Sequence, residues 1–187
     1  DNSPDKTWEI IKEYSKNRKN IHLIIRNKKE GLDTAHKLAY EYCISNNYEF
    51  LITMDADLSH DPKKIPIFIK ELKTNAFVIG SRYMNGGKCD MEGLRLFLSY
   101  CGNKFIKFIF NIDCNEFTTS YRGFNLIKLK NFTLEEVSSS GYSFFMETVY
   151  LIHNKGFFIK QIPIYFKDRN IPKRIIYNYC LEKKNED

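Results

Sequence analysis

The sequence lacks the patterns that mark several common classes of protein. Its 187 residues contain five cysteines and four histidines, with no Cys-x-x-Cys pair and no His-Glu-x-x-His motif. An odd number of scattered cysteines argues against structural zinc or a disulfide framework and favours a reducing compartment. Without metal-binding spacing, the histidines are expected to be surface or packing residues rather than ligands.

Long apolar runs and a targeting segment are missing as well. No apolar stretch approaches the ~20 residues that a membrane-spanning helix needs, and the first residues do not resemble a signal peptide. The hydrophobic share of 43% and the charged share of 28% are typical of a folded globular chain. We therefore expect one domain over residues 1–187, with a frayed tail from about residue 175.

Positive charge is in excess, with 29 lysines and arginines against 23 acids and a net charge of +6. Such an excess favours anionic partners: nucleotide phosphates, a lipid phosphate or an acidic membrane surface. No nucleic-acid-binding motif accompanies the basic residues, so no nucleic-acid partner is expected.

Strand and helix patterns alternate along the chain. Strands are predicted over residues 21–25, 50–54, 76–79 and 156–166, and helices over residues 8–14, 34–45, 62–72 and 142–154. This alternation predicts an α/β fold with a mainly parallel sheet flanked by helices. No strand precedes the first helix, and we expect the chain to begin inside its domain, with the first strand missing.

The apolar run from Phe50 to Met54 ends abruptly in two acids, Asp55 and Asp57. A continuous apolar run predicts a strand buried on both faces, and ligands of open α/β sheets bind beyond the carboxyl ends of such strands. Alternate residues of extended backbone point in opposite directions, so the two carboxylates need a local turn to converge. Converged carboxylates favour Mg²⁺ or Mn²⁺. Taken alone, the pattern equally fits solvated acids that cap the next helix.

Residues 94–112 form a different kind of segment, rich in aromatic and aliphatic side chains and interrupted by Arg95, Lys104 and Lys107. An interfacial amphipathic helix has this composition, with apolar side chains at the acyl boundary and basic ones at the headgroups. A helix packed in the core has it too. Both interpretations stay open, and one helix can satisfy both with different faces.

Five separated motifs resemble those of family 2 inverting glycosyltransferases, in the branch that acts on dolichyl or other polyprenyl phosphates. Residues 1–7 resemble D-x-S-x-D-x-T, and residues 55–60 resemble the D-A-D-L-x-H metal motif. Residues 80–83 match G-S-R-Y, residues 116–122 resemble D-x-T-S-G-F-R, and residues 162–169 resemble I-P-I-x-F-x-D-R. Each motif is short and weak alone, whereas their shared order along the chain is specific.

The resemblance implies a GT-A fold and a defined reaction. A sugar, mannose or glucose, would pass with inversion from a GDP-mannose or UDP-glucose type of donor to a polyprenyl phosphate, assisted by Mg²⁺ or Mn²⁺. The enzyme would sit peripherally on the cytoplasmic face of a membrane, with a membrane-anchoring partner subunit as one means of attachment.

The resemblance also assigns residues to the donor. Asp55 and Asp57 would hold the metal ion that neutralises the departing diphosphate, with Ser59 as a third ligand. Ser59 stands where the family commonly has Gln. Asp1 would lie near the nucleotide base, and Arg26 with Gly31 and Asp55 would complete the donor site.

For the acceptor, the resemblance implies that Arg82, Arg95 and Arg169 bind the lipid phosphate, because guanidinium forks suit phosphate oxygens. Arg82 joins the two acids as a catalytic residue. Ser99, one helical turn beyond Arg95, would add a hydroxyl donor. A phosphate is already ionised at neutral pH, so no general base is required. Arg122 and Glu147 are expected to pair within the fold.

Some residues depart from the family pattern. Glu116 and Ser120 replace Asp and Gly, a Pro-Lys-Arg sequence follows Arg169, and the opening Pro-x-Tyr-Asn-Glu segment is absent. Three alternatives therefore stay open. One is transfer to a glycan hydroxyl, with Glu116 or Asp113 as base. Another is phosphoryl hydrolysis with Asp55 as nucleophile, and the last is a non-catalytic copy that binds nucleotide or lipid.

Overall fold

The computed structural model describes residues 6–167, and the backbone of residues 176–183. The helices are α1 (Thr7–Ser15), α2 (Leu32–Ser45), α3 (Ile65–Leu72), α4 (Gly93–Phe110) and α5 (Gly141–Asn154), with 3-10 turns at Pro62–Lys64 and Leu134–Glu136. The strands are β1 (Tyr48–Asp55), β2 (Phe77–Ser81), β3 (Lys88–Cys89), β4 (Arg122–Asn125), β5 (Ile159–Pro163), β6 (Tyr165–Phe166) and β7 (Ile176–Lys183). The α/β class predicted from the sequence is confirmed.

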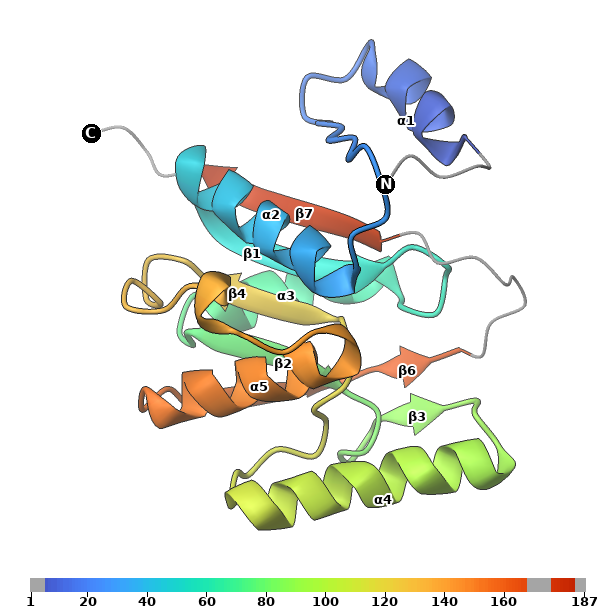
Figure 1. Ribbon diagram of the computed structural model, residues 1–187, viewed down its shortest axis with the longest axis vertical. Helices are drawn as coiled ribbons and strands as arrows, with labels where there is room; N and C mark the ends of the chain where they lie inside the picture. The colour runs from blue at the N-terminus through green and yellow to red at the C-terminus, as the bar shows by residue number, and fades with distance from the viewer. Residues whose placement is uncertain (1–5, 168–175, 184–187) are drawn as a thin grey trace.

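The main sheet is mixed, with the strand order β5-β2-β4-β1-β7 (Figure 1). Strands β2 and β5 are parallel, whereas β4 is antiparallel to both of its neighbours and β7 is antiparallel to β1. The prediction of a mainly parallel sheet is therefore wrong. Strand β4 runs back between β1 and β2, and its first residue, Arg122, pairs with Thr53 and Ile79 near the ends of those strands. This reversal brings the loop before β4 to the edge where β1 and β2 end.

Helices cover both faces of the sheet. Leu51, Phe77 and Phe124 point toward α2 and α5 and join one buried cluster. Their neighbours Phe50 and Val78 point the other way and pack in a second cluster around α3. Successive residues of a strand face opposite sides, so a strand buried on both sides must be apolar throughout. Burial of the apolar run before Asp55 on both faces is thus confirmed.

Two backbone expectations need correction. Residues 21–25 do not form a strand. Strands persist only when their backbone groups are paired, and both edges of β1 are already paired, with β4 and β7. Residues 176–183, expected to be frayed, form β7 beside β1. Cys43 in α2 is disulfide-bonded, although the scattered cysteines argued against a disulfide framework.

Helix α4 lies apart from the helices that cover the sheet, at the lower edge of the view in Figure 1. All 18 of its residues are described, and only Asn103 among them is buried. Its exposed large apolar residues are Leu94, Phe97, Leu98, Tyr100, Phe105, Phe108, Ile109 and Phe110. The interpretation of this segment as a core helix is therefore wrong for most of its surface. Across the described residues, no helix combines the length and the apolar character needed to cross a membrane.

Candidate active site

A cleft of about 250 Å³ opens at the sheet edge where β1 and β2 end and β4 begins. Four of the residues singled out in the sequence line it: Asp55, Arg82, Arg95 and Ser99. The loop before β4 contributes residues 118–120, and α2 contributes its first residue, Leu32. Asp57, Ser59, Arg26 and Gly31 are not part of this lining. The structure thus brings one acid of the metal motif to the same cavity as the predicted phosphate-binding residues.

The chain turns sharply after β1, as the sequence required. Leu58 has a left-handed backbone with φ 64°, which is uncommon for a residue with a side chain. Asp57 Oδ1 accepts hydrogen bonds from Ser59 N at 3.1 Å and from Ser59 Oγ at 2.5 Å. Asp57 and Ser59 are both buried. The hydroxyl of Ser59 therefore fixes the orientation of the Asp57 carboxylate.

Asp55 is held from two directions. Its Oδ1 accepts a hydrogen bond from Ser120 Oγ at 2.7 Å, and its backbone N–H donates to His60 Nδ1 at 3.1 Å. Burial lowers the pKa of His60, although the nearby charges of Asp55 and Asp57 oppose that shift. Because Nδ1 accepts the hydrogen bond from the Asp55 N–H, it carries no proton, and Nε2 lies 3.4 Å from Thr119 Oγ1. The packing role expected for histidines is confirmed here, since His60 also lies against the rings of Tyr121 and Phe166.

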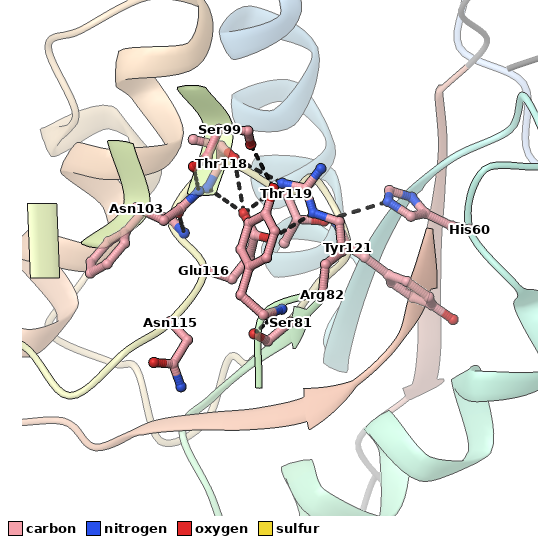
Figure 2. Close-up of polar contacts among 12 residues, drawn as sticks. His60, Ser81, Arg82, Ser99, Asn103, Asn115, Glu116, Thr118, Thr119 and Tyr121 are labelled. Atoms are coloured by element: carbon pink, nitrogen blue, oxygen red, sulfur yellow. Dashed lines mark hydrogen bonds and ion pairs between the residues drawn. The ribbon is translucent and has the colours of Figure 1, made fainter. Parts of the chain in front are cut away.

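Arg82, directly after β2, forms a buried ion pair with Glu116 (Figure 2). Its Nε lies 2.7 Å from Glu116 Oε2, its Nη2 lies 2.9 Å from Oε1, and Nη2 also donates to Thr118 Oγ1 at 3.1 Å. Burial lowers the pKa of Arg82, but the charge and hydrogen bonds of Glu116 outweigh this effect and leave the pKa above its usual value. None of these bonds uses Nη1, which leaves that nitrogen as a donor for a ligand in the cleft.

Ser99 lies on α4 one turn after Arg95 and accepts a hydrogen bond from Tyr83 Oη at 2.7 Å. A hydroxyl that accepts one bond still has its own proton to donate. Its oxygen is therefore positioned by Tyr83 while its O–H can turn toward a ligand. Arg95 is exposed where it lines the cleft. The predicted acceptor residues Arg82, Arg95 and Ser99 thus meet at one cavity.

The loop before β4 connects the two sides of the cleft. Ser120 holds Asp55 through its hydroxyl, and its carbonyl accepts a hydrogen bond from Thr53 Oγ1 at 2.6 Å. Glu116 at the other end of the loop holds Arg82. Tyr121 donates to the carbonyl of Asp61 at 3.0 Å, which ties the loop to the turn after β1. Positions that depart from the family pattern, Glu116 and Ser120, are therefore the ones that contact the key charged groups.

Arg122 and Glu147 do not form the expected pair. Arg122 donates to the carbonyls of Thr119 and Phe117, both at 2.8 Å. Burial lowers the pKa of its guanidinium to about 9. Glu147 instead accepts bonds from the backbone N–H groups of residues 138 and 139. The guanidinium of Arg122 also lies 4.6 Å from the centre of the Phe145 ring in α5, so Arg122 connects the loop that lines the cleft to this helix.

The predicted donor end is described only in part. Arg26 Nη1 donates to Thr34 Oγ1 at 2.5 Å and Nη2 donates to the carbonyl of Gly31 at 3.2 Å. Gly31 has φ 106°, a conformation that favours glycine, and precedes the first turn of α2. These bonds shape the loop that leads into α2, whose first residue reaches the cleft. Asp1 and Arg169 lie outside the described residues.

The donor set at the turn after β1 suits a hard divalent cation. The carboxylates of Asp55 and Asp57 and the hydroxyl of Ser59 provide only oxygen ligands, which Mg²⁺ and Mn²⁺ prefer. Each carboxylate has two oxygens and several lone pairs, and the hydrogen bonds from Ser120 and Ser59 involve one oxygen of each. Among residues 6–167, no group of three or more His, Cys, Asp or Glu is arranged around a common metal position. A metal here would rely on two acids and on oxygens of the substrate.

Several residues that line the cleft or bond to its lining had no role predicted from the sequence: Thr118, Thr119, Tyr83 and Asn103. Thr118 and Thr119 stand inside a motif that was noted, and Tyr83 is the last residue of another. Asn103 had no signal beyond its place among apolar residues. The carboxylates considered as bases are both engaged, Glu116 with Arg82 and Asp113 with Lys107 at 2.6 Å.

Comparisons with known proteins identify the family of the chain. The family described as Glycosyl transferase family 2 matches residues 1–132. The chain is 28% identical over 172 residues to an undecaprenyl-phosphate mannosyltransferase of Micrococcus luteus, covering 91% of this chain and 71% of that protein. It is 30% identical over 174 residues to a polyprenol monophosphomannose synthase of Mycolicibacterium smegmatis, covering 91% of this chain and 66% of that protein. With its helix-flanked mixed sheet of the GT-A type and this match, the chain belongs to glycosyl transferase family 2.

Proposed function

We propose that this chain transfers a hexose from a nucleotide-diphosphate sugar to a polyprenyl phosphate. The proposed hexose is mannose, with glucose as the alternative. The observation that carries the proposal is the meeting of Asp55 with Arg82, Arg95 and Ser99 at one cleft. One side of that cleft presents carboxylate, and the other presents cationic and hydroxyl donors. A diphosphate on the donor and a phosphate on the acceptor match this division of charge. The names of the two relatives support the same lipid class and the same sugar.

On the donor side, Asp55 and Asp57 would hold Mg²⁺ or Mn²⁺, with Ser59 close enough to serve as a further ligand. The ion would supply Lewis-acid neutralisation of the departing diphosphate. The protein's own part is positional: Ser120 and Ser59 hold the two carboxylates, and His60 holds the backbone N–H of Asp55, before any ligand arrives. Such preorganisation avoids the cost of reorienting charges during the reaction.

On the acceptor side, Arg82 Nη1, Arg95 and the Ser99 hydroxyl would hold the lipid phosphate. Charge-assisted hydrogen bonds of this kind contribute roughly 1.5–3 kcal/mol each. Because the phosphate is already an anion, the residues need only align its oxygen with the sugar carbon, and no base has to remove a proton. The engagement of Glu116 by Arg82 is consistent with this scheme. Inversion at the sugar is part of the proposal on the ground of family membership alone.

The exposed apolar surface of α4 supports a peripheral position on a membrane. Lys104 and Lys107 accompany the exposed aromatic residues, as expected for a helix between headgroups and acyl chains. Such a position would deliver the lipid phosphate directly to Arg95 and Ser99 on the same helix. The cytoplasmic face and an anchoring partner subunit stay predictions from the sequence resemblance.

A transfer assay tests the proposal. The chain is incubated with Mg²⁺ or Mn²⁺, labelled GDP-mannose or UDP-glucose, and either farnesyl phosphate or free mannose as acceptor. We expect label in the farnesyl-phosphate product with one of the two donors and none on free mannose. Transfer to free mannose alone, or to neither acceptor, contradicts the proposed function.

A further inference from the structure

The only buried residue of α4 is polar. Asn103 is 2% exposed, whereas the aromatic residues of the same helix point into solvent. A buried amide costs free energy unless both its donor and its acceptor are satisfied. An apolar residue at this position would lower the free-energy cost of packing α4 against the rest of the domain. The presence of an amide therefore has to be explained by its contacts.

Both ends of the Asn103 amide are engaged, and they join two different parts of the site. Its Oδ1 accepts a hydrogen bond from the backbone N–H of Phe117 at 2.7 Å, and its Nδ2 donates to the carbonyl of Ser99 at 2.8 Å. Phe117 follows Glu116, the partner of Arg82. Figure 2 shows Asn103 beside Glu116, on the side of Arg82 away from His60.

Lys107 and Ser99 also connect α4 to its surroundings, through hydrogen bonds that are less protected from water. Lys107 reaches Asp113 at 2.6 Å and Asn115 at 3.2 Å, in exposed or partly buried positions, and the bond from Tyr83 to Ser99 is partly buried. The bond from Phe117 to Asn103 is buried. Buried hydrogen bonds are not exchanged for bonds to water, so this one best defines where α4 sits relative to the loop.

We infer that Asn103 is a positioning residue for the acceptor phosphate. Through its amide it fixes the distance between the α4 turn that carries Ser99 and Arg95 and the loop that holds Arg82 through Glu116. The cationic groups of two separate elements are thereby kept around one anion. This inference rests on the proposed function for its ligand, and it adds a residue that does not touch the substrate.

The test compares Asn103→Leu, which removes both bonds with little change in size, with Asn103→Asp, which keeps an acceptor for Phe117 N–H. Asn131→Leu, the same replacement at an exposed position, is the matched control. For each variant, KM is measured for farnesyl phosphate and for the sugar donor, and farnesyl-phosphate binding is measured separately by calorimetry. We expect Asn103→Leu to raise the KM and the Kd for farnesyl phosphate about tenfold or more, with the donor KM changed less than about twofold. Asn103→Asp should give a smaller change, and Asn131→Leu none.

A double variant separates positioning from stability. If Asn103 acts through the α4 residues, then Asn103→Leu should weaken farnesyl-phosphate binding much less in an Arg95→Ala background than in the wild type. Additive effects, or equal loss of affinity for donor and acceptor, would overturn the inference and leave Asn103 with a role in folding only. If Asn103→Leu does not fold, the same criteria apply to Asn103→Asp.

A wild-type chain that binds farnesyl phosphate without transferring sugar refutes the proposed function alone, because the ratios of the Kd values still decide the role of Asn103. A wild-type chain that does not bind farnesyl phosphate refutes both.

Discussion

The turn after β1 and helix α4 both line the cleft, but they are built in opposite ways. In the turn, Asp55, Asp57, Ser59 and His60 are all buried, and side-chain hydrogen bonds fix them within the protein. In α4, a single residue of 18 is buried and most of the large apolar side chains are exposed. The polar groups of the turn are therefore fixed by hydrogen bonds within the protein, whereas the apolar surface of α4 is exposed. A diphosphate with its metal needs preorganised charge, whereas a lipid substrate arrives with an apolar environment of its own.

The largest expected effect comes from breaking the turn side of this comparison. Asp57→Asn keeps an amide oxygen that can accept the bonds from Ser59, so the fold should persist. It removes a carboxylate charge from the predicted metal site. We expect kcat/KM for transfer to fall by roughly a hundredfold or more, measured across a titration of Mn²⁺. A variant that keeps wild-type activity and wild-type Mn²⁺ affinity would show that the metal assignment is wrong.

Arg82→Ala addresses the junction between the two sides. Loss of the guanidinium should raise the KM for lipid phosphate about tenfold or more while changing the donor KM much less. It also leaves Glu116 buried without its partner, which typically costs about 3–5 kcal/mol of stability. Both quantities are measurable, by steady-state kinetics and by urea unfolding.

The double variant Arg82→Met/Glu116→Gln is the control for this stability effect. It removes both charges, and therefore we expect stability to recover relative to Arg82→Ala while the KM for lipid phosphate stays high. If the single variant raises both KM values equally, Arg82 belongs to the donor diphosphate and not to the acceptor.

The smallest expected effect tests α4 alone. Phe108 is 81% exposed on this helix, and Phe158, outside it, is 68% exposed. If α4 enters the membrane interface, Phe108→Ser should weaken binding to anionic lipid vesicles by about tenfold, because inserting a phenylalanine side chain is worth roughly 1.5–3 kcal/mol. Phe158→Ser should leave binding unchanged, and neither variant should alter the melting temperature much. Sedimentation with vesicles measures the difference, and equal losses for both variants would argue against a membrane role specific to α4.

Most helices and the buried strand before Asp55 could be predicted because their periodicity is local. Helix α2 begins at Leu32 and α5 at Gly141, within two residues of the positions expected. The direction of β4 could not be predicted, because its four residues, Arg122–Asn125, carry no information about which neighbours they will pair with. Residues 21–25 have a strand composition without a strand, since composition does not provide a partner for backbone hydrogen bonds.

The site was predictable to the extent that its residues stand in contiguous motifs. Asp55, Arg82, Arg95 and Ser99 were named from sequence and lie at one cleft. Glu116 was not predicted to be the partner of Arg82, and Arg122 was predicted to pair with Glu147. Both errors have one reason: the partners of a buried arginine depend on which distant segments of the chain pack around it. Asn103 could not be found at all, since a buried asparagine in an apolar helix has the same sequence pattern as an exposed one.

By itself, the sequence determined the α/β class, the strand that ends in two acids, the family and the chemical types available for a two-phosphate site. These depend on local composition and on short ordered motifs. Only the tertiary structure decided that β4 runs back between β1 and β2 and carries its preceding loop to Asp55 and Arg82. It alone showed that α4 turns its aromatic residues outward and buries the amide of Asn103 against the loop before β4. The physical reason is that strand pairing and burial are contacts between segments far apart in the chain, and no local pattern specifies them.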